Sequence, residues 1–182
     1  MRPRAAAVAA MGLAVAVALP LAGCGPLDRQ PVTVPAVTAP AATGPALSPT
    51  EFTARADAAC TRLYSRLGRL GRPPTDDIAT ARRYYPAVAA AWHRLLDETG
   101  ALNAPPEVRT TWREIVEAYR ATAQNADENV LLAGTDREAI EIVNSDASAR
   151  MQEAQVFMAS RAADIGLRAC AGAGSASAPQ GG

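Results

Sequence analysis

The stretch IGLRACAG, residues 165–172, contains Cys170, one of the three cysteines in a chain of 182 residues. This cysteine could be a metal ligand, a reactive thiol, or one half of a disulfide with Cys24 or Cys60. The choice bears on the whole fold, because a bridge to Cys60 would join the two ends of the segment that carries a regular apolar pattern. The surroundings of the other two cysteines therefore decide the question.

The N-terminus has the organisation of an export signal. MRPR is followed by an uncharged apolar run as far as Pro20 and then by LAGC, residues 21–24. A positive start, a short apolar run and small residues before a cleavage point are typical of a secretory signal. LAGC resembles the bacterial lipobox, which implies a lipoprotein signal peptide over residues 1–23 and a diacylglycerol on Cys24. The alternative is an ordinary cleaved signal that happens to contain a cysteine.

Two segments lack the pattern of a packed domain. Residues 24–47 contain five prolines among threonines, valines and alanines. Proline fixes φ and removes a backbone donor, so we expect an extended linker here rather than a helix or a strand. Threonines beside prolines would also suit an O-glycosylated stalk, although a bare linker fits equally well. Residues 173–182, small and polar, are expected to form a disordered tail.

Residues 48–172 show helical periodicity throughout, with apolar residues spaced by three and four. The sequence Ser-Pro-Thr-Glu at residues 48–51 predicts a capping box at the start of the first helix. Thr135, followed by Glu138, predicts another one at the start of the last helix. Pro86 lies inside the second pattern, which keeps its phase across it, so we expect one kinked helix there. The four predicted helices span residues 48–71, 75–100, 105–134 and 135–165.

Short connections between long helices favour an all-α, antiparallel up-down-up-down four-helix bundle. If the second and third helices pivot tightly about their connection, Trp92 lies level with Trp112, and Tyr85 lies level with Tyr119. The next connection pairs Trp112 with Met158 and Tyr119 with Met151. Large side chains would then share layers of the core.

Side chains that could carry chemistry are few. His93 is the only histidine, and the Glu-x-x-His and Cys-x-x-Cys-His motifs of di-iron and haem bundles do not occur. A haem held by His93 with Met151 or Met158 is conceivable, but His93 lies beside the apolar stripe of its helix. We therefore expect no metal, no cofactor, no catalytic residue and no activity that depends on His93. A net charge of zero without a basic run argues against binding to nucleic acid.

Two polar residues, Asn144 and Ser148, lie nearest the apolar seam of the last helix. We expect them to form hydrogen bonds across the seam. The alternative is that they line an internal pocket together with Tyr85 and Tyr119.

Export and lipidation bear directly on Cys170. Disulfides persist in oxidising compartments, and a lipid on Cys24 leaves Cys60 as the partner for an intrachain bridge to Cys170. A structural zinc site would need four ligands, which two cysteines and one histidine cannot supply. The simplest register places Cys60 about 22 Å along the bundle from Cys170. Either the first helix slides by about a heptad, or the last helix ends at Gly166 and residues 167–170 double back; we expect some of both.

Several motifs together resemble a group of small actinobacterial lipoproteins. The lipobox and the proline-rich linker are accompanied by ADAAC (56–60), NAPPEV (103–108), AGTD (133–136) and IGLRAC (165–170). Members of that group pair a cysteine of the first helix with one in a terminal Leu-Gly-Leu-x-x-Cys motif, in which Ile165 replaces the first leucine here. The resemblance implies a helical domain with the Cys60–Cys170 pair and brings no established activity.

The expected function is that of a non-catalytic, lipid-anchored envelope module, monomeric and on the extracytoplasmic face of the cell membrane. Its partner would be another envelope protein or a wall polymer. The alternative is a protein that carries a small ligand or a cofactor inside the bundle, or an enzyme. A filled core favours the non-catalytic envelope module, and an internal cavity favours the carrier or the enzyme.

Overall fold

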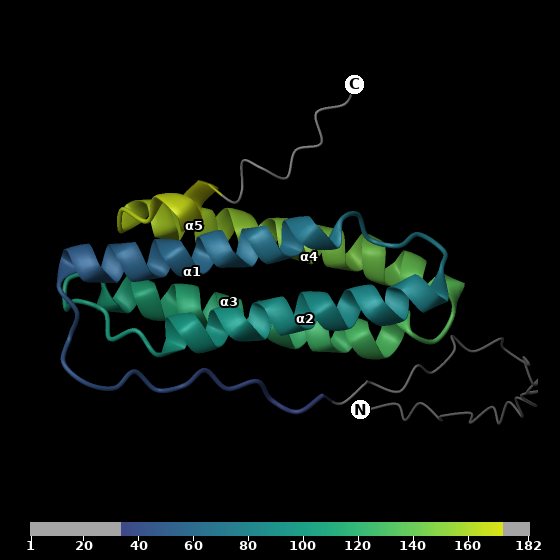
Figure 1. The fold of residues 1–182 in the computed structure, drawn as a ribbon, viewed down its shortest axis with the longest axis horizontal. Coiled ribbons are helices and arrows are strands. Elements are labelled where there is room, and N and C mark those ends of the chain that lie inside the picture. The colour runs from purple at the N-terminus through teal and green to yellow at the C-terminus, as the bar shows by residue number, and fades with distance from the viewer. Residues whose placement is uncertain (1–33, 173–182) are drawn as a thin grey trace, which may run out of the picture. The chain divides into compact units, whose positions relative to one another are not determined.

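The structure, a computed structural model, describes residues 34–172, except for the side chains of residues 146–148. The predicted signal peptide, Cys24 and the predicted tail lie outside the described residues. Five helices and no strands occur in the described part of the chain, so the all-α prediction is confirmed (Figure 1). They are α1 (Pro49–Leu70), α2 (Ile78–Gly100), α3 (Arg109–Ala133), α4 (Arg137–Asp164) and α5 (Arg168–Gly172).

The start of α1 follows the local sequence closely. The backbone N–H of Glu51 donates to Oγ of Ser48, and the N–H of Ser48 donates to Oε2 of Glu51, each over 3.3 Å. This confirms the predicted capping box. The second helix continues through Pro86 as a single helix, which confirms the choice of one helix over two. The bend at Pro86 stays a prediction.

Three other helix starts differ from the prediction. The second helix begins at Ile78 and not at residue 75, with Asp77 as its cap, because Oδ1 of Asp77 accepts the N–H of Ala79 at 2.9 Å. Asp136, rather than Thr135, caps α4 in the same way, with 2.7 Å to the N–H of Ala139. In both cases an aspartate closer to the helix reaches the free N–H groups. The third helix begins at Arg109 and not at residue 105, because the N–H of Val108 donates to the carbonyl of Pro105 in a turn.

The late start of α3 changes its register against α2. Trp92 lies beside Tyr119, with ring centroids 6.3 Å apart, while Trp112 meets the ring of Phe52 edge-on at 5.0 Å. Tyr85 belongs to a separate cluster between α2, α3 and α4. The predicted level pair Tyr85–Tyr119 is therefore wrong by about two helical turns. The predicted layer of Trp112 and Met158 stays a prediction; both side chains belong to the main core cluster.

The helices pack in chain order, α1 on α2, α2 on α3 and α3 on α4. Among the described residues, no Cα atom of α1 lies within 8 Å of one in α4. The short helix α5 instead contacts both of them, and Figure 1 shows it alongside α1 and α4. The short helix α5 therefore covers the core between α1 and α4.

The extended segment before α1 packs against the helices. The N–H of Leu47 donates to the carbonyl of Asn103 at 2.9 Å, and Nδ2 of Asn103 donates to the carbonyl of Gly44 at 2.7 Å. Val37, Ala39 and Leu47 pack on the main core cluster. The prediction of a linker over 24–47 therefore needs a correction within the described residues: residues 34–47 form no helix or strand, as expected, but residues 37–47 pack on the helices and are not a free spacer.

Gly100 makes room for this segment. A Cβ atom at position 100 would lie 2.9 Å from Cδ of Pro40 and 3.2 Å from Cβ of Ala39. Such distances are too short for ordinary packing, so the missing side chain allows the close approach. Among the described helices, none combines the length and the apolar character that crossing a membrane requires.

Candidate functional site

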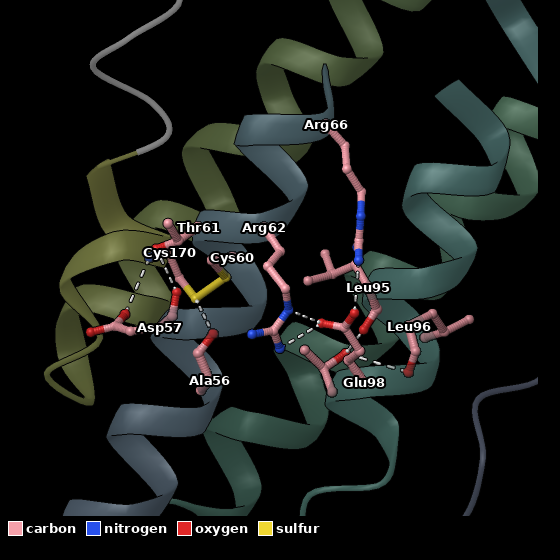
Figure 2. Close-up of polar contacts among 11 residues, drawn as sticks. Ala56, Asp57, Cys60, Thr61, Arg62, Arg66, Leu95, Leu96, Glu98 and Cys170 are labelled. Carbon is pink, nitrogen blue, oxygen red and sulfur yellow. Dashed lines mark hydrogen bonds and ion pairs between the residues drawn. A yellow bond between two sulfur atoms is a disulfide. The ribbon is translucent and has the colours of Figure 1, made fainter. Parts of the chain in front are cut away.

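The short helix α5 is joined to α1 by a disulfide between Cys60 and Cys170, whose Cα atoms lie 5.2 Å apart (Figure 2). This separation is below the 7 Å that a bridge allows. Both expected adjustments occur. The chain turns between Asp164 and Arg168, and α1 is displaced along α2. Arg62 bonds to Glu98, whereas the simplest register of the first two helices pairs Leu63 with Tyr85 and so sets Arg62 level with Pro86.

The carboxylate of Asp57 caps α5 from a different helix. It accepts the backbone N–H groups of Ala169 at 2.8 Å, Arg168 at 3.2 Å and Cys170 at 3.4 Å. These are N–H groups that a helix leaves unpaired at its start, and a negative charge there is favoured by the helix dipole. Asp57 lies three residues before Cys60, hence on the same face of α1. Asp57 and Cys60 of the motif ADAAC thus hold the same short helix.

The turn that brings α5 back is a Schellman motif. The N–H of Gly166 donates to the carbonyl of Ala163 at 3.0 Å, and the N–H of Leu167 donates to that of Ala162 at 2.9 Å. Gly166 has a φ of 77°, which favours glycine, and Leu167 is completely buried. The motif IGLRAC therefore has a physical account: a glycine for the reversal, a leucine for the core and a cysteine for the bridge. We call Asp57, Cys60, Gly166, Leu167 and Cys170 the α5 clamp.

Tyr119 belongs to this region and not to a pocket. Its Oη lies 3.3 Å from Sγ of Cys60. Because a disulfide sulfur carries no hydrogen, the tyrosine hydroxyl is the donor. Burial raises the pKa of Tyr119 far above its usual range, so the hydroxyl keeps its proton. The alternative of an internal pocket shared by Tyr85 and Tyr119 does not hold for Tyr119, because the register of α3 places it in the core beside the bridge.

The other predicted pocket residues are partly brought together. The hydroxyl of Tyr85 donates to Oδ1 of Asn144 at 2.7 Å, and Nδ2 of Asn144 donates to the carbonyl of Pro74 at 2.9 Å. Both side chains line a mostly apolar cavity of about 160 Å³, together with Trp92 and Met151. The expected hydrogen bond across the seam and the alternative pocket therefore coincide at Asn144. The side chain of Ser148 lies outside the described residues.

His93 has a partner that sequence reasoning missed. Its Nε2 lies 2.9 Å from Oδ2 of Asp127 on α3, and both side chains are partly exposed. The corrected register explains the omission, since α3 begins later than predicted. Within residues 34–172, no group of three His, Cys, Asp or Glu side chains is arranged to hold a metal ion.

A third polar group links α1 to α2. Arg62 donates to Oε2 of Glu98 from Nε at 3.0 Å and from Nη2 at 2.8 Å, and Arg66 donates to Oε1 at 3.2 Å (Figure 2). Partial burial by itself would raise the pKa of Glu98. The hydrogen bonds and charges of the two arginines outweigh it, so the pKa lies below its ordinary value. Nothing in the local sequence marked Glu98, because its partners lie more than thirty residues away.

Comparisons with protein-family models, with curated proteins and with solved structures gave no match.

Proposed function

We propose that this protein is a non-catalytic, lipid-anchored module on the extracytoplasmic face of the cell membrane, where its helical domain binds another envelope protein. The lipobox-like LAGC supports the anchor. The Cys60–Cys170 bridge supports export, because disulfides persist in oxidising compartments. The resemblance to small actinobacterial lipoproteins is consistent with both. The domain would be a monomeric up-down-up-down bundle of α1 to α4, a topology that the short connections favour.

Binding to a partner protein is inferred from two exposed apolar residues on α4. Val156 is 68% exposed and Phe157 is 42% exposed. The guanidinium of Arg161 lies over the ring of Phe157 at 5.6 Å and bonds to Glu114 of α3 at 3.2 Å. Aromatic rings and arginines are enriched at the centres of protein interfaces. We call Val156, Phe157 and Arg161 the α4 patch.

A photocrosslinking residue at position 156 of the full-length protein tests the proposal in the native membrane. We expect a discrete crosslinked protein, identified by mass spectrometry, that is absent when the same residue replaces Asp97. Asp97 is exposed on α2 and controls for random collisions. Equal crosslinking from both positions, or none from position 156, would contradict the proposal. Crosslinks to glycan instead of protein would identify a wall polymer as the partner.

The cavity at Tyr85 and Asn144 favours a second candidate function, the carriage of a small apolar molecule. Its volume of about 160 Å³ is close to that of an engineered cavity that accepts benzene. A fluorinated aromatic ketone, followed by ¹⁹F NMR, is a suitable probe. Saturable binding that is lost in Ala126→Leu, which would fill the cavity, supports this candidate. Equal binding by the variant, or no binding, excludes it.

A further inference from the structure

Three arginines from two helices surround a shallow pocket between α1 and α2. Arg66 and Arg69 come from α1 and Arg94 comes from α2, and they line a volume of about 240 Å³. The rest of its lining consists of Leu70 of α1 and of three small side chains of α2, namely Ala87, Ala90 and Ala91. The alanines leave space that larger side chains would fill, so the arginines border a hollow and not a flat surface. We call this the α1–α2 arginine pocket.

The positive charge around this pocket is only partly compensated. Within the described residues, Glu98 is the carboxylate that pairs with an arginine of the pocket, namely Arg66. Its other oxygen accepts from Arg62, which lies outside the pocket. Arg69 makes its side-chain hydrogen bond to Ser65 on its own helix. Arg94 forms no hydrogen bond or ion pair in the part of the chain that the structure describes. The guanidinium groups of Arg69 and Arg94 therefore carry charge that no described side chain neutralises.

Arg66 adds a donor without an acceptor. Its Nη1 is buried and has no hydrogen-bond partner among the described residues, while Nη2 bonds to Glu98. A buried donor left unpaired is costly, so buried polar groups in native proteins are nearly always paired. Because Arg66 lines the pocket, a ligand with acceptor oxygens bound there is the kind of group that would pair this donor.

We infer that the α1–α2 arginine pocket binds a phosphate group. Guanidinium groups match the oxygens of phosphate with paired, charge-assisted hydrogen bonds. Three donors that approach from two helices suit a tetrahedral anion with several acceptor oxygens better than a planar carboxylate with two. The phosphate could be free or could belong to the headgroup of a phospholipid, and the chemistry at the arginines is the same for both. This inference does not depend on a protein partner at the α4 patch.

Titration of the full-length protein, purified in a non-ionic detergent at low ionic strength, tests the inference. Inorganic phosphate is the first probe, and binding is followed by the ³¹P line width. Dihexanoyl phosphatidylglycerol, below its micellar concentration, is the second probe, with dihexanoyl phosphatidylcholine as its zwitterionic control. Arg94→Gln and Arg69→Gln are the informative variants, because neither residue bonds to another helix and the fold should survive. Melting temperatures verify that it does.

We expect saturable binding that weakens about tenfold or more in each variant, as the loss of one charge-assisted bond implies. Arg113→Gln removes the same charge from an exposed, unpaired arginine of α3 and should leave binding unchanged within about twofold. Tighter binding of the phosphatidylglycerol than of phosphate would identify a lipid headgroup as the source, and the reverse a free phosphate. No saturable binding of either probe up to about 10 mM, or an equal effect of Arg113→Gln, would overturn the inference.

Discussion

Replacing Asp57 by alanine should loosen α5 without breaking the bridge. The carboxylate accepts three N–H groups at the start of α5, at 2.8, 3.2 and 3.4 Å. Asp57 is partly exposed, so water can reach these N–H groups after the change. The loss therefore corresponds to an N-cap substitution, and not to three fully buried bonds. N-cap losses of about 0.5–2 kcal/mol, with the charge–dipole contribution included, suggest about 1.5 kcal/mol here.

Two measurements detect this loss. For a domain of this size, about 1.5 kcal/mol lowers Tm by roughly 5 °C. The amide hydrogens of Arg168, Ala169 and Cys170 should exchange about tenfold faster if they exchange by local opening. Asp57→Asn keeps an acceptor oxygen but loses the charge, so its effect should be intermediate.

Asp97→Ala is the matched control, because Asp97 is an exposed helical aspartate whose side chain makes no bond in the described part of the chain. If Asp57→Ala and Asp97→Ala have the same Tm, and amide exchange in α5 is unchanged, then Asp57 does not cap α5. A fall in Tm with unchanged exchange in α5 would also refute the reasoning, since the destabilisation would then lie elsewhere.

Three further predictions concern single positions. Gly166→Ala should cost about 1 kcal/mol through backbone strain alone, because φ is 77° and nothing lies within 4 Å of the new Cβ; chemical denaturation measures this, and an unchanged midpoint would contradict it. Gly100→Ala should displace the segment before α1, since its Cβ would lie 2.9 Å from Cδ of Pro40. Limited proteolysis within residues 37–47 should then accelerate, whereas Gly68→Ala, with open space around it, should have no such effect. Glu98→Gln should lower the stability of the fold at neutral pH, because it removes the charge that pairs with Arg62 and Arg66. The pKa of Glu98 in the folded protein lies below the ordinary carboxyl value of 4.5, so this charge stabilises the fold fully above pH 4.5. The stabilisation is lost as the pH falls through the pKa of the folded protein. The stability gap between wild type and variant should therefore close in acid, and a gap independent of pH would exclude this ion pair as its cause.

Features set by neighbouring residues were predictable from the sequence. The capping box of Ser48 and Glu51 needs only residues three apart, and helical periodicity is sufficient for the all-α class. An end of the last helix at Gly166, followed by a reversal over residues 167–170, was one of the two expected adjustments, since a glycine that follows an apolar helical run is a local signal. The Cys60–Cys170 pair followed from the number of cysteines and from export, and required no knowledge of the packing.

Features that depend on register were not predictable. The start of α3 is decided by whether residues 105–108 form a turn or the first helical turn, and that choice moves every α2–α3 contact. His93–Asp127 and the place of Tyr119 follow from it. Asp57 contacts residues more than a hundred positions away, and its one local sign is its spacing of three from Cys60. The packed segment before α1 has the composition of a free linker, and its contacts with Asn103 and Gly100 lie too far along the chain to be read locally.

Non-reducing mass spectrometry of the protein extracted from its native membrane tests the central claim most directly, namely that an exported, lipid-anchored domain is closed by the α5 clamp. The account predicts an N-terminal peptide that begins at Cys24 and carries diacylglycerol, and a linked pair of peptides that contain Cys60 and Cys170. An unmodified Cys24, or a mature N-terminus elsewhere, would contradict the anchor. Free thiols at Cys60 and Cys170 would contradict the clamp.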